Sequence, residues 1–381
     1  MINISDKRKC TGCAACFNIC PFHCIEMKED EEGFIYPIVN QDECRECGLC
    51  NKVCPELNVK RCKNEFNNVY VASNKDKQVL QKSSSGGIFY ELAKNILTNG
   101  GVVYGAAFEE NNILNHIEVS DINHLKKLLK SKYIQSNIND VYKKIKENIK
   151  NDKYVLFCGT PCQVSGLKKY LDKDYEKLIL VDFICHGVPN QKLFQKYLDD
   201  IRTFCNETSQ IKKIDFRSKD LNWEKFGMKI EFESGKIYSN DGNTDYWIKS
   251  FLQDIMLRPS CYNCANKGID RNSDITLADA WGIEQYNSAF YNKQGTSLVV
   301  VHTLKGQNKI EEIKSCIMID SVEEDFIKKH NVNTYYSAIA DRRRKQFFKH
   351  INKGYGFKEC VDKVIGIDFL TRVERKIKRK K

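Results

Sequence analysis

The sequence predicts a small α+β domain followed by a larger α/β domain with a mostly parallel sheet. Three observations lead to this prediction. Of the 18 cysteines in the 381 residues, 10 lie before residue 63. After residue 68, short apolar stretches typical of strands alternate with stretches of helical periodicity. Residues 341–381 hold 15 Lys or Arg against 5 Asp or Glu. We therefore expect domains at 1–62 and 66–340 and a basic C-terminal tail at 341–381.

Charge and hydropathy argue against a nucleic-acid-binding protein and against a membrane-spanning one. The formal net charge is +11, but the first 60 residues hold 7 basic and 10 acidic side chains. The basic excess thus belongs to the tail and does not mark a nucleic-acid-binding protein. The longest apolar runs, such as 154–158, are far shorter than the roughly 20 residues of a membrane-spanning helix. The N-terminus, MINISDKRKC, lacks the apolar stretch of a secretion signal, so we expect a cytoplasmic protein.

Two cysteine arrays with the same spacing lie near the N-terminus. They read CTGCAACFNICP at 10–21 and CRECGLCNKVCP at 44–55. Three thiolates in a tight turn hold three corners of an iron–sulfur cube, and the cysteine before proline in the other array supplies the fourth, as in bacterial dicluster ferredoxins. The spacing predicts an α+β ferredoxin-like dicluster domain with two [4Fe–4S] clusters. The expected ligands are Cys10, Cys13, Cys16 and Cys54 for the first cluster, and Cys44, Cys47, Cys50 and Cys20 for the second.

The competing interpretations of these arrays are weaker. Zinc sites usually show two CxxC pairs rather than three cysteines in series, and disulfides are disfavoured in the cytosol. Cys24 and Cys62 lie outside the pattern, and we expect both to be small buried apolar residues rather than ligands.

The elements of the α/β domain follow from its apolar periodicity. We expect strands at 69–72, 102–108, 154–158, 178–184, 211–216, 228–232 and 298–301. We expect helices at 87–97, 125–129, 141–149, 161–171 and 193–201. The helix at 161–171 has the clearest start, because Thr160, Pro161 and Gln163 fit the N-cap, N1 and N3 positions of a capping box.

Four further cysteines lie where an α/β sheet builds sites. Cys162 would be the second residue of that helix, where the helix dipole is expected to lower its thiol pKa. Cys185 follows the next strand, and parallel strands end at the same sheet edge. If Cys261 and Cys264 fold over this edge, four thiolates converge and could bind a third [4Fe–4S] cluster. A nucleophilic Cys162–His186 pair, or buried cysteines without chemistry, are the alternatives.

The same region carries several motifs that together resemble a known family. They are SSSGG at 83–87, GVVYGAAF at 101–108, SKYIQS at 131–136, GTPCQ at 159–163, CHGVP at 185–189, the Cys261/Cys264 block, DITLADAWG at 274–282 and GTS at 295–297. Over residues 5–305 the chain resembles the beta subunit of coenzyme F420-dependent hydrogenases and dehydrogenases, in the bacterial form with a fused ferredoxin domain. Ala278 and Ala280 depart from this family's usual glycine and aromatic residue, so we expect a pocket of altered shape there.

The resemblance implies an iron–sulfur flavoprotein oxidoreductase. It implies a bound flavin, expected as FAD, and it favours the third cluster. Flavin would pass electrons between the one-electron clusters and a two-electron carrier, either coenzyme F420 or another small organic substrate. A ferredoxin or a redox enzyme is the expected protein partner. The alternative is an electron-transfer adaptor subunit without turnover of its own, and a cluster-bearing redox sensor is a third interpretation.

Several residues are candidates for cofactor contacts. Ser84, Ser85, Gly86 and Gly87 precede a helix, where backbone N–H groups can bind the flavin pyrophosphate or simply cap the helix. Lys132 could pair with a cofactor anion or be solvated. His186 could donate a proton near the flavin, although a structural role is favoured. Asp279 and Trp281 could line the site or pack in the core.

The basic tail has apolar residues at near-helical spacing. They are Val361, Val364, Ile365, Phe369, Leu370, Val373 and Ile377. Such a helix could make a peripheral membrane contact or pack on its own domain with a frayed charged end.

Overall fold

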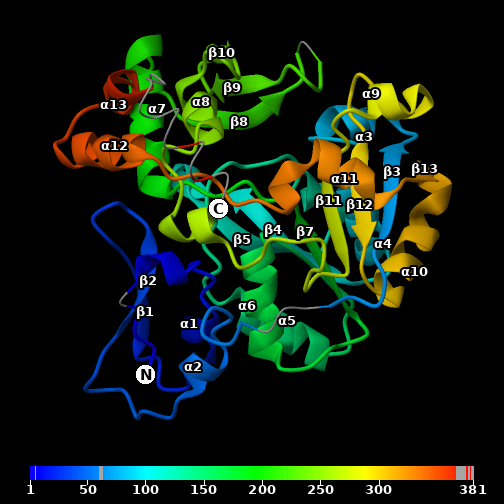
Figure 1. Ribbon diagram of the computed structural model, residues 1–381, viewed down its shortest axis with the longest axis horizontal. Coiled ribbons are helices and arrows are strands. Elements are labelled where there is room, and N and C mark those ends of the chain that lie inside the picture. Colours follow the sequence, from blue (N-terminus) through cyan, green and yellow to red (C-terminus); the bar gives the residue numbers. More distant parts are fainter. Residues whose placement is uncertain (5, 60–62, 221, 366–374, 376–377, 379–381) are drawn as a thin grey trace.

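The protein is described by a computed structural model that covers residues 1–381 except 5, 60–62, 221, 366–374, 376–377 and 379–381. A small N-terminal domain lies beside an α/β domain built on a large sheet, and a smaller sheet with several helices completes the molecule (Figure 1). In this described part of the chain, no helix combines the length and hydropathy that crossing a bilayer requires. The predicted fold class, a ferredoxin-like domain followed by an α/β domain, is confirmed.

The N-terminal domain repeats one small unit. The strands β1 (Ile25–Glu29) and β2 (Ile35–Val39) pair antiparallel. The short helices α1 (Ala15–Ile19) and α2 (Leu49–Lys52) each contain the third cysteine of an array. Each helix follows a residue with a left-handed backbone, Ala14 in one case and Gly48 in the other. The core is unusually rich in sulfur, because Cys16, Cys20, Cys24 and Cys50 pack there with two isoleucines.

The large sheet has eight strands in the order β13-β3-β12-β11-β7-β6-β4-β5. Their bounds are β3 (Asn68–Asn74), β4 (Val102–Phe108), β5 (Leu114–Val119), β6 (Val155–Cys158), β7 (Leu178–Phe183), β11 (Ile275–Asp279), β12 (Ser297–Val301) and β13 (Ile317–Ser321). The four central strands β4, β6, β7 and β11 are parallel, and the flanking strands run antiparallel to their neighbours. The sheet is therefore parallel at its centre and antiparallel at both edges.

Helices cover both faces of this sheet. One face packs against α4 (Ile88–Thr98) and α10 (Leu304–Ile313), and the other against α5 (Val141–Lys150) and α6 (Pro161–Leu171). The helices α3 (Lys77–Lys82), α9 (Ile283–Tyr286) and α11 (Glu324–His330) lie toward the β3 and β12 side (Figure 1). The stretch expected as a helix at 125–129 is instead part of a 3₁₀ segment, Ile122–Lys127.

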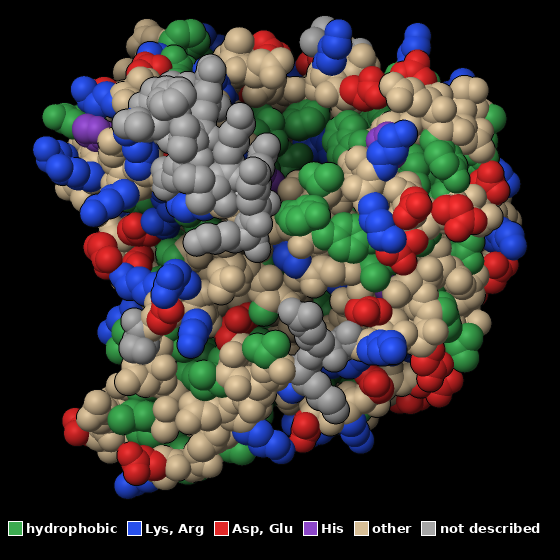
Figure 2. All heavy atoms as spheres, in the orientation of Figure 1, with side chains coloured by type: hydrophobic (Ala, Val, Ile, Leu, Met, Phe, Trp, Pro, Cys, Tyr) green, Lys and Arg blue, Asp and Glu red, His purple; other side chains and the backbone are tan. Residues whose placement is uncertain are grey.

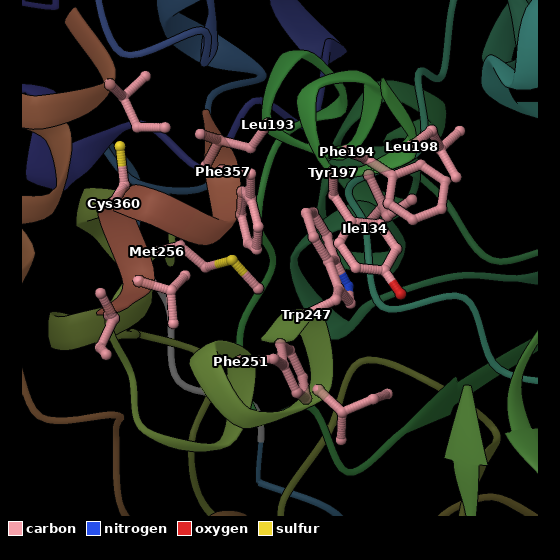
Figure 3. Close-up of a cluster of buried hydrophobic side chains, with 14 of the residues drawn as sticks. Ile134, Leu193, Phe194, Tyr197, Leu198, Trp247, Phe251, Met256, Phe357 and Cys360 are labelled. Atoms are coloured by element: carbon pink, nitrogen blue, oxygen red, sulfur yellow. The ribbon is translucent and has the colours of Figure 1, made fainter. Parts of the chain in front are cut away.

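A second sheet and four helices share another core. The sheet has the order β10-β9-β8, with β8 (Ile211–Ser218), β9 (Gly227–Phe232) and β10 (Ile237–Asp241) all antiparallel. Its helices are α7 (Gln191–Cys205), α8 (Tyr246–Leu252), α12 (Arg342–Asn352) and α13 (Phe357–Val364). Figure 3 shows how Phe194, Trp247 and Phe357 meet in this core. The ring centroids of Trp247 lie 4.9 Å from Phe194 and 5.5 Å from Phe357.

This core includes the first part of the expected C-terminal tail at 341–381, in line with the alternative that the tail packs on its own domain. The helices α12 and α13 bury Phe347, Phe357, Val361 and Val364, so residues 342–364 are packed rather than free. These helices pack on the domain despite their basic charges. Burial of their aromatic and branched apolar side chains supplies the favourable transfer free energy. The expected membrane-contact segment at 370–381 lies outside the described residues apart from Arg375 and Lys378.

Candidate redox site

The structure brings the cysteines expected at the first cluster around one pocket. Cys10, Cys13 and Cys16 of the first array line it together with Cys54 of the second array. Cys13 and Cys16 are both buried, and burial raises the pKa of the free Cys16 thiol to about 12. The crossing of one cysteine from the far array is the feature that the spacing predicted.

The cysteines expected at the second cluster surround another pocket. Cys20 comes from the first array, and Cys44, Cys47 and Cys50 come from the second. Cys47 is exposed, so this pocket opens toward solvent. Cys24 also lines the pocket, and its Sγ lies 3.4 Å from the Sγ of Cys20. Cys24 is buried, as expected. It nevertheless lies beside cysteines that are expected to bind the second cluster. Cys62 lies outside the described residues.

The downstream cysteines line a third pocket at the edge of the large sheet. Cys162 is the second residue of α6, Cys185 follows β7, and Cys261 and Cys264 lie in and directly after the 3₁₀ segment Pro259–Asn263. The expected capping box is confirmed, with the Gln163 side chain accepting from the backbone N–H of Thr160 at 2.9 Å. Four sulfurs from three chain segments therefore surround one space.

Burial determines the pKa values of the free thiols in this third pocket. It raises the pKa of Cys162, of Cys185 and of Cys261 to about 12 each. The expectation that the helix dipole lowers the pKa of Cys162 is wrong for the free thiol, because loss of water outweighs the dipole. A coordinating cation deprotonates such thiols outright, so this burial is compatible with ligation.

The cysteine sets differ from the ligand shell of a single metal ion. Among the described residues, no three His, Cys, Asp or Glu side chains converge as ligands of a single ion would. The thiolates of a [4Fe–4S] cluster each bind a different iron, so they surround the cluster at its four corners.

His186 lines the third pocket, but its ring is already engaged. Its Nε2 lies 2.8 Å from Oδ1 of Asp254, and its Nδ1 lies 3.3 Å from Nδ2 of Asn333. With both ring nitrogens held by the protein, His186 is poorly placed to activate Cys162 as a base. The geometry favours the structural role over the nucleophilic pair.

The Ser–Gly loop joins three of the motifs found in the sequence. Ser84 Oγ accepts a hydrogen bond from the backbone N–H of Ser131 at 2.7 Å. Ser85 Oγ donates to the carbonyl of Thr296 at 2.8 Å. Gly87 has a φ of 79° and begins α4, which spans 11 residues. The loop is thus held by its side chains, and the first N–H groups of α4 follow it.

Gly86 is packed too closely to carry a side chain. A Cβ at this position would lie 2.4 Å from the carbonyl oxygen of Ala72 and 2.7 Å from the nitrogen of Ser297. Its own N–H donates to Ser297 Oγ at 2.9 Å. The glycine therefore lets the loop lie directly on the ends of β3 and β12.

Lys132 does not bond to the Ser–Gly loop. Its Nζ donates to the carbonyl of Leu129 at 2.8 Å and to that of Lys127 at 3.2 Å. Burial lowers its pKa to about 7, while the acidic groups of Cys158 and Asp215 lie near enough to oppose that shift. The side chain is therefore partly desolvated rather than extended into water.

Three cationic residues near this loop were missed in the sequence. They are Lys130, Arg217 and Lys219. Lys219 Nζ donates to the carbonyls of Leu80, at 3.0 Å, and Gln294, and burial together with the charges of Arg217 and Lys130 lowers its pKa to about 7. Lys130 pairs with Asp215. The sequence offered two weak signals for them. Arg217 and Lys219 lie at the end of an expected strand, and Lys130 directly precedes the SKYIQS motif.

Asp279 and Trp281 lie close to Arg217, one of these three cations. Asp279 pairs with Arg217 at 2.5 Å and accepts from Nε1 of Trp223 at 2.8 Å. Trp281 stacks on Trp223 with centroids 4.9 Å apart and planes 7° apart. Ala280, one of the two departures from the family pattern, is fully buried. Figure 2 shows a hollow between the three-stranded sheet and the part of the large sheet that carries α9.

The first and third pockets are neighbours. Thr11 lines both of them. Gly166 of α6 lies against the first array, and a Cβ there would be 3.0 Å from the Sγ of Cys13. The second pocket contains the exposed cysteine, Cys47, whereas the first set holds three buried cysteines and the third set consists of half-buried ones.

Comparison with known proteins gives two family matches. Residues 9–58 match the 4Fe-4S dicluster domain. Residues 152–325 match the family described as the C terminus of the coenzyme F420 hydrogenase/dehydrogenase beta subunit. No curated protein matches the chain. Among solved structures, it is similar to a chain of the F420-reducing [NiFe] hydrogenase complex from Methanosarcina barkeri, with 15% identity and a TM-score of 0.48, over 81% of this chain and 94% of that one. The chain therefore joins a segment that matches the 4Fe-4S dicluster domain to a segment that matches the C terminus of the coenzyme F420 hydrogenase/dehydrogenase beta subunit family.

Proposed function

We propose that the protein is an oxidoreductase that moves electrons between three [4Fe–4S] clusters, a bound FAD and a small two-electron carrier. One observation carries this proposal: the twelve cysteines expected as ligands line three pockets in sets of four, with Cys24 as an additional cysteine beside the second set. The two family matches support electron transfer through iron–sulfur clusters and an oxidoreductase activity.

The clusters would be held by the cysteine sets described above. Bound clusters exchange single electrons, and flavin converts between one-electron and two-electron transfer. The chain's contribution is to place the first and third sets beside each other and to leave the second set open at Cys47. That opening supports a ferredoxin or a redox enzyme as the protein partner. Because thiolate-bound iron persists in a reducing compartment, we also propose a cytoplasmic location.

The Ser–Gly loop and its cationic neighbours would hold the flavin. Backbone N–H groups at the start of α4 suit a pyrophosphate, and Lys130, Arg217 and Lys219 add positive charge nearby. Two of these cations already pair with Asp215 and Asp279, which leaves Lys219 as the residue bonded to carbonyls alone. The two-electron carrier would be coenzyme F420 or another small organic substrate.

The experiment that tests the proposal is anaerobic purification followed by flavin quantitation and a turnover assay. Bound flavin and reduction of coenzyme F420 or a dye by the isolated chain would support an enzyme. Clusters without flavin, and without turnover, would instead favour the adaptor subunit.

Flavin affinity should fall as the pH rises from 6 to 8. The pKa values of Lys132 and Lys219 are both about 7, so both side chains are cationic at pH 6 and largely neutral at pH 8. Loss of positive charge weakens binding of an anionic pyrophosphate, and we expect about a tenfold higher Kd at pH 8. Titration of flavin-depleted protein with FAD at the two pH values measures this. Lys219→Met should flatten the profile, and equal or tighter binding at pH 8 in the native protein would refute the expectation.

A further inference from the structure

Arg258 is a buried cation without an acidic partner. Its side chain is 0% exposed. In the described part of the chain, no carboxylate lies within ion-pair distance of it. Its Nε donates to the carbonyl of Cys10 at 2.8 Å, and its Nη2 donates to that of Ile35 at 2.8 Å. Burying an unpaired guanidinium is costly, so a negative charge close by is needed to balance it.

The nearest candidate for that negative charge is the sulfur of Cys10. Nη2 of Arg258 lies 3.7 Å from the Cys10 Sγ, within hydrogen-bonding range for sulfur. Nη1 donates to Oε1 of Gln135 at 3.0 Å, which fixes the plane of the guanidinium. The ring of Tyr36 lies 4.4 Å from Cζ. The cation is therefore held rigidly with one N–H aimed at a cysteine of the first pocket.

Arg258 also belongs to the third pocket. It lines that pocket and precedes Cys261 by three residues. On the other side, Gly12 of the first array makes room for it, because a Cβ on Gly12 would lie 2.9 Å from Nη1. The Arg258 side chain thus contacts the backbone of the first cysteine array. The backbone of Arg258 leads directly into the segment that holds Cys261 of the third pocket.

We propose that Arg258 is a positioning residue that fixes the approach of the first and third clusters and raises the reduction potential of the first. This inference rests on the proposed function, because it requires clusters at both sets of cysteines. A reduced cluster is more negative than an oxidised one, and a desolvated cation that hydrogen-bonds to its sulfur stabilises the reduced form. Transfer between the two sites takes one electron from one centre and gives it to the other, with no bond made or broken.

The test compares neutral and charged replacements of Arg258 in the full chain. Arg258→Met and Arg258→Gln remove the charge, and Arg258→Lys keeps it while losing the planar fork. Arg344→Met is the matched control, because Arg344 joins the two domains through Glu32 at 2.5 Å and not through a cluster cysteine. The readout is the midpoint potential of the first cluster in a redox titration followed by electron paramagnetic resonance, with its signal assigned as the one that Cys54→Ala lacks.

We expect the neutral variants to lower the ratio of reduced to oxidised first cluster about tenfold at a fixed potential, which is about 59 mV for one electron. Arg258→Lys should retain most of the native potential, and Arg344→Met should leave it unchanged. Either neutral variant suffices if the other does not fold. Unchanged potentials in the folded neutral variant, or equal shifts in Arg344→Met, would overturn the proposal. A native protein that lacks iron would instead overturn the proposed function, which the iron content reveals before any variant is compared.

Discussion

Replacing Cys54 by alanine should remove the first cluster, although Cys54 lies in the second array. Cys54 lines the first pocket with Cys10, Cys13 and Cys16, so its loss leaves three ligands for four corners. We expect about four iron atoms fewer per chain and loss of one paramagnetic signal after reduction. The domain should also lose stability, because its small core is built largely of cysteines and metal binding supplies folding free energy.

Cys24→Ala is the matched control for this prediction. Cys24 is equally part of the N-terminal core, but it lies outside the two ligand sets. Its replacement should leave the iron content unchanged. If Cys54→Ala keeps its full iron content, or if Cys24→Ala loses as much, the assignment of ligands is wrong.

Replacing Gly86 by alanine should disable the flavin loop. The new Cβ would lie 2.4 Å from the carbonyl oxygen of Ala72 and 2.7 Å from the nitrogen of Ser297, and both of these neighbours are backbone atoms of paired strands. We expect the free energy of unfolding to fall by about 3 kcal/mol, as for severe overpacking. Bound flavin per chain should fall with it, because the loop must move away from β12. Chemical denaturation and flavin release measure the two effects.

Gly105→Ala separates this effect from a general cost of adding a methyl group. Gly105 lies in β4, and a Cβ there would meet its nearest neighbour, Leu128, at an ordinary 3.5 Å. We expect a change within about 0.5 kcal/mol and normal flavin content. Iron content serves as the internal standard for folded protein in both variants. Normal flavin binding in folded Gly86→Ala would show that the loop does not hold the cofactor.

The sequence predicted most of the elements whose pattern is strong. The central strands β4, β6 and β7 are short continuous apolar runs, and the capping box marked the start of α6. The strand β5, LNHIEV, was missed because polar residues interrupt its apolar pattern. The strand β13 was missed because only its first residue is buried. The basic charges of α12 concealed its buried Phe347 and Phe348.

The residues of the candidate sites also differ in how far a local sequence pattern could predict them. Cysteine spacing is a local signal, so the grouping of the eight sulfurs of the two arrays could be expected before the fold was known. The grouping of Cys162, Cys185, Cys261 and Cys264 was expected only from neighbouring strand ends and from the family resemblance. The partners of Lys219 are carbonyls on separate segments, and Arg258 joins positions 10, 35 and 135, so neither role leaves a local pattern. The dipole argument for Cys162 failed because sequence does not report how deeply a thiol is buried.

The count of iron and acid-labile sulfide in freshly isolated, anaerobic protein tests the central claim most directly. Three occupied four-cysteine pockets predict about twelve of each per chain. About eight of each would contradict the third cluster at Cys162, Cys185, Cys261 and Cys264. Colourless protein, or protein loaded with zinc, would contradict the whole account.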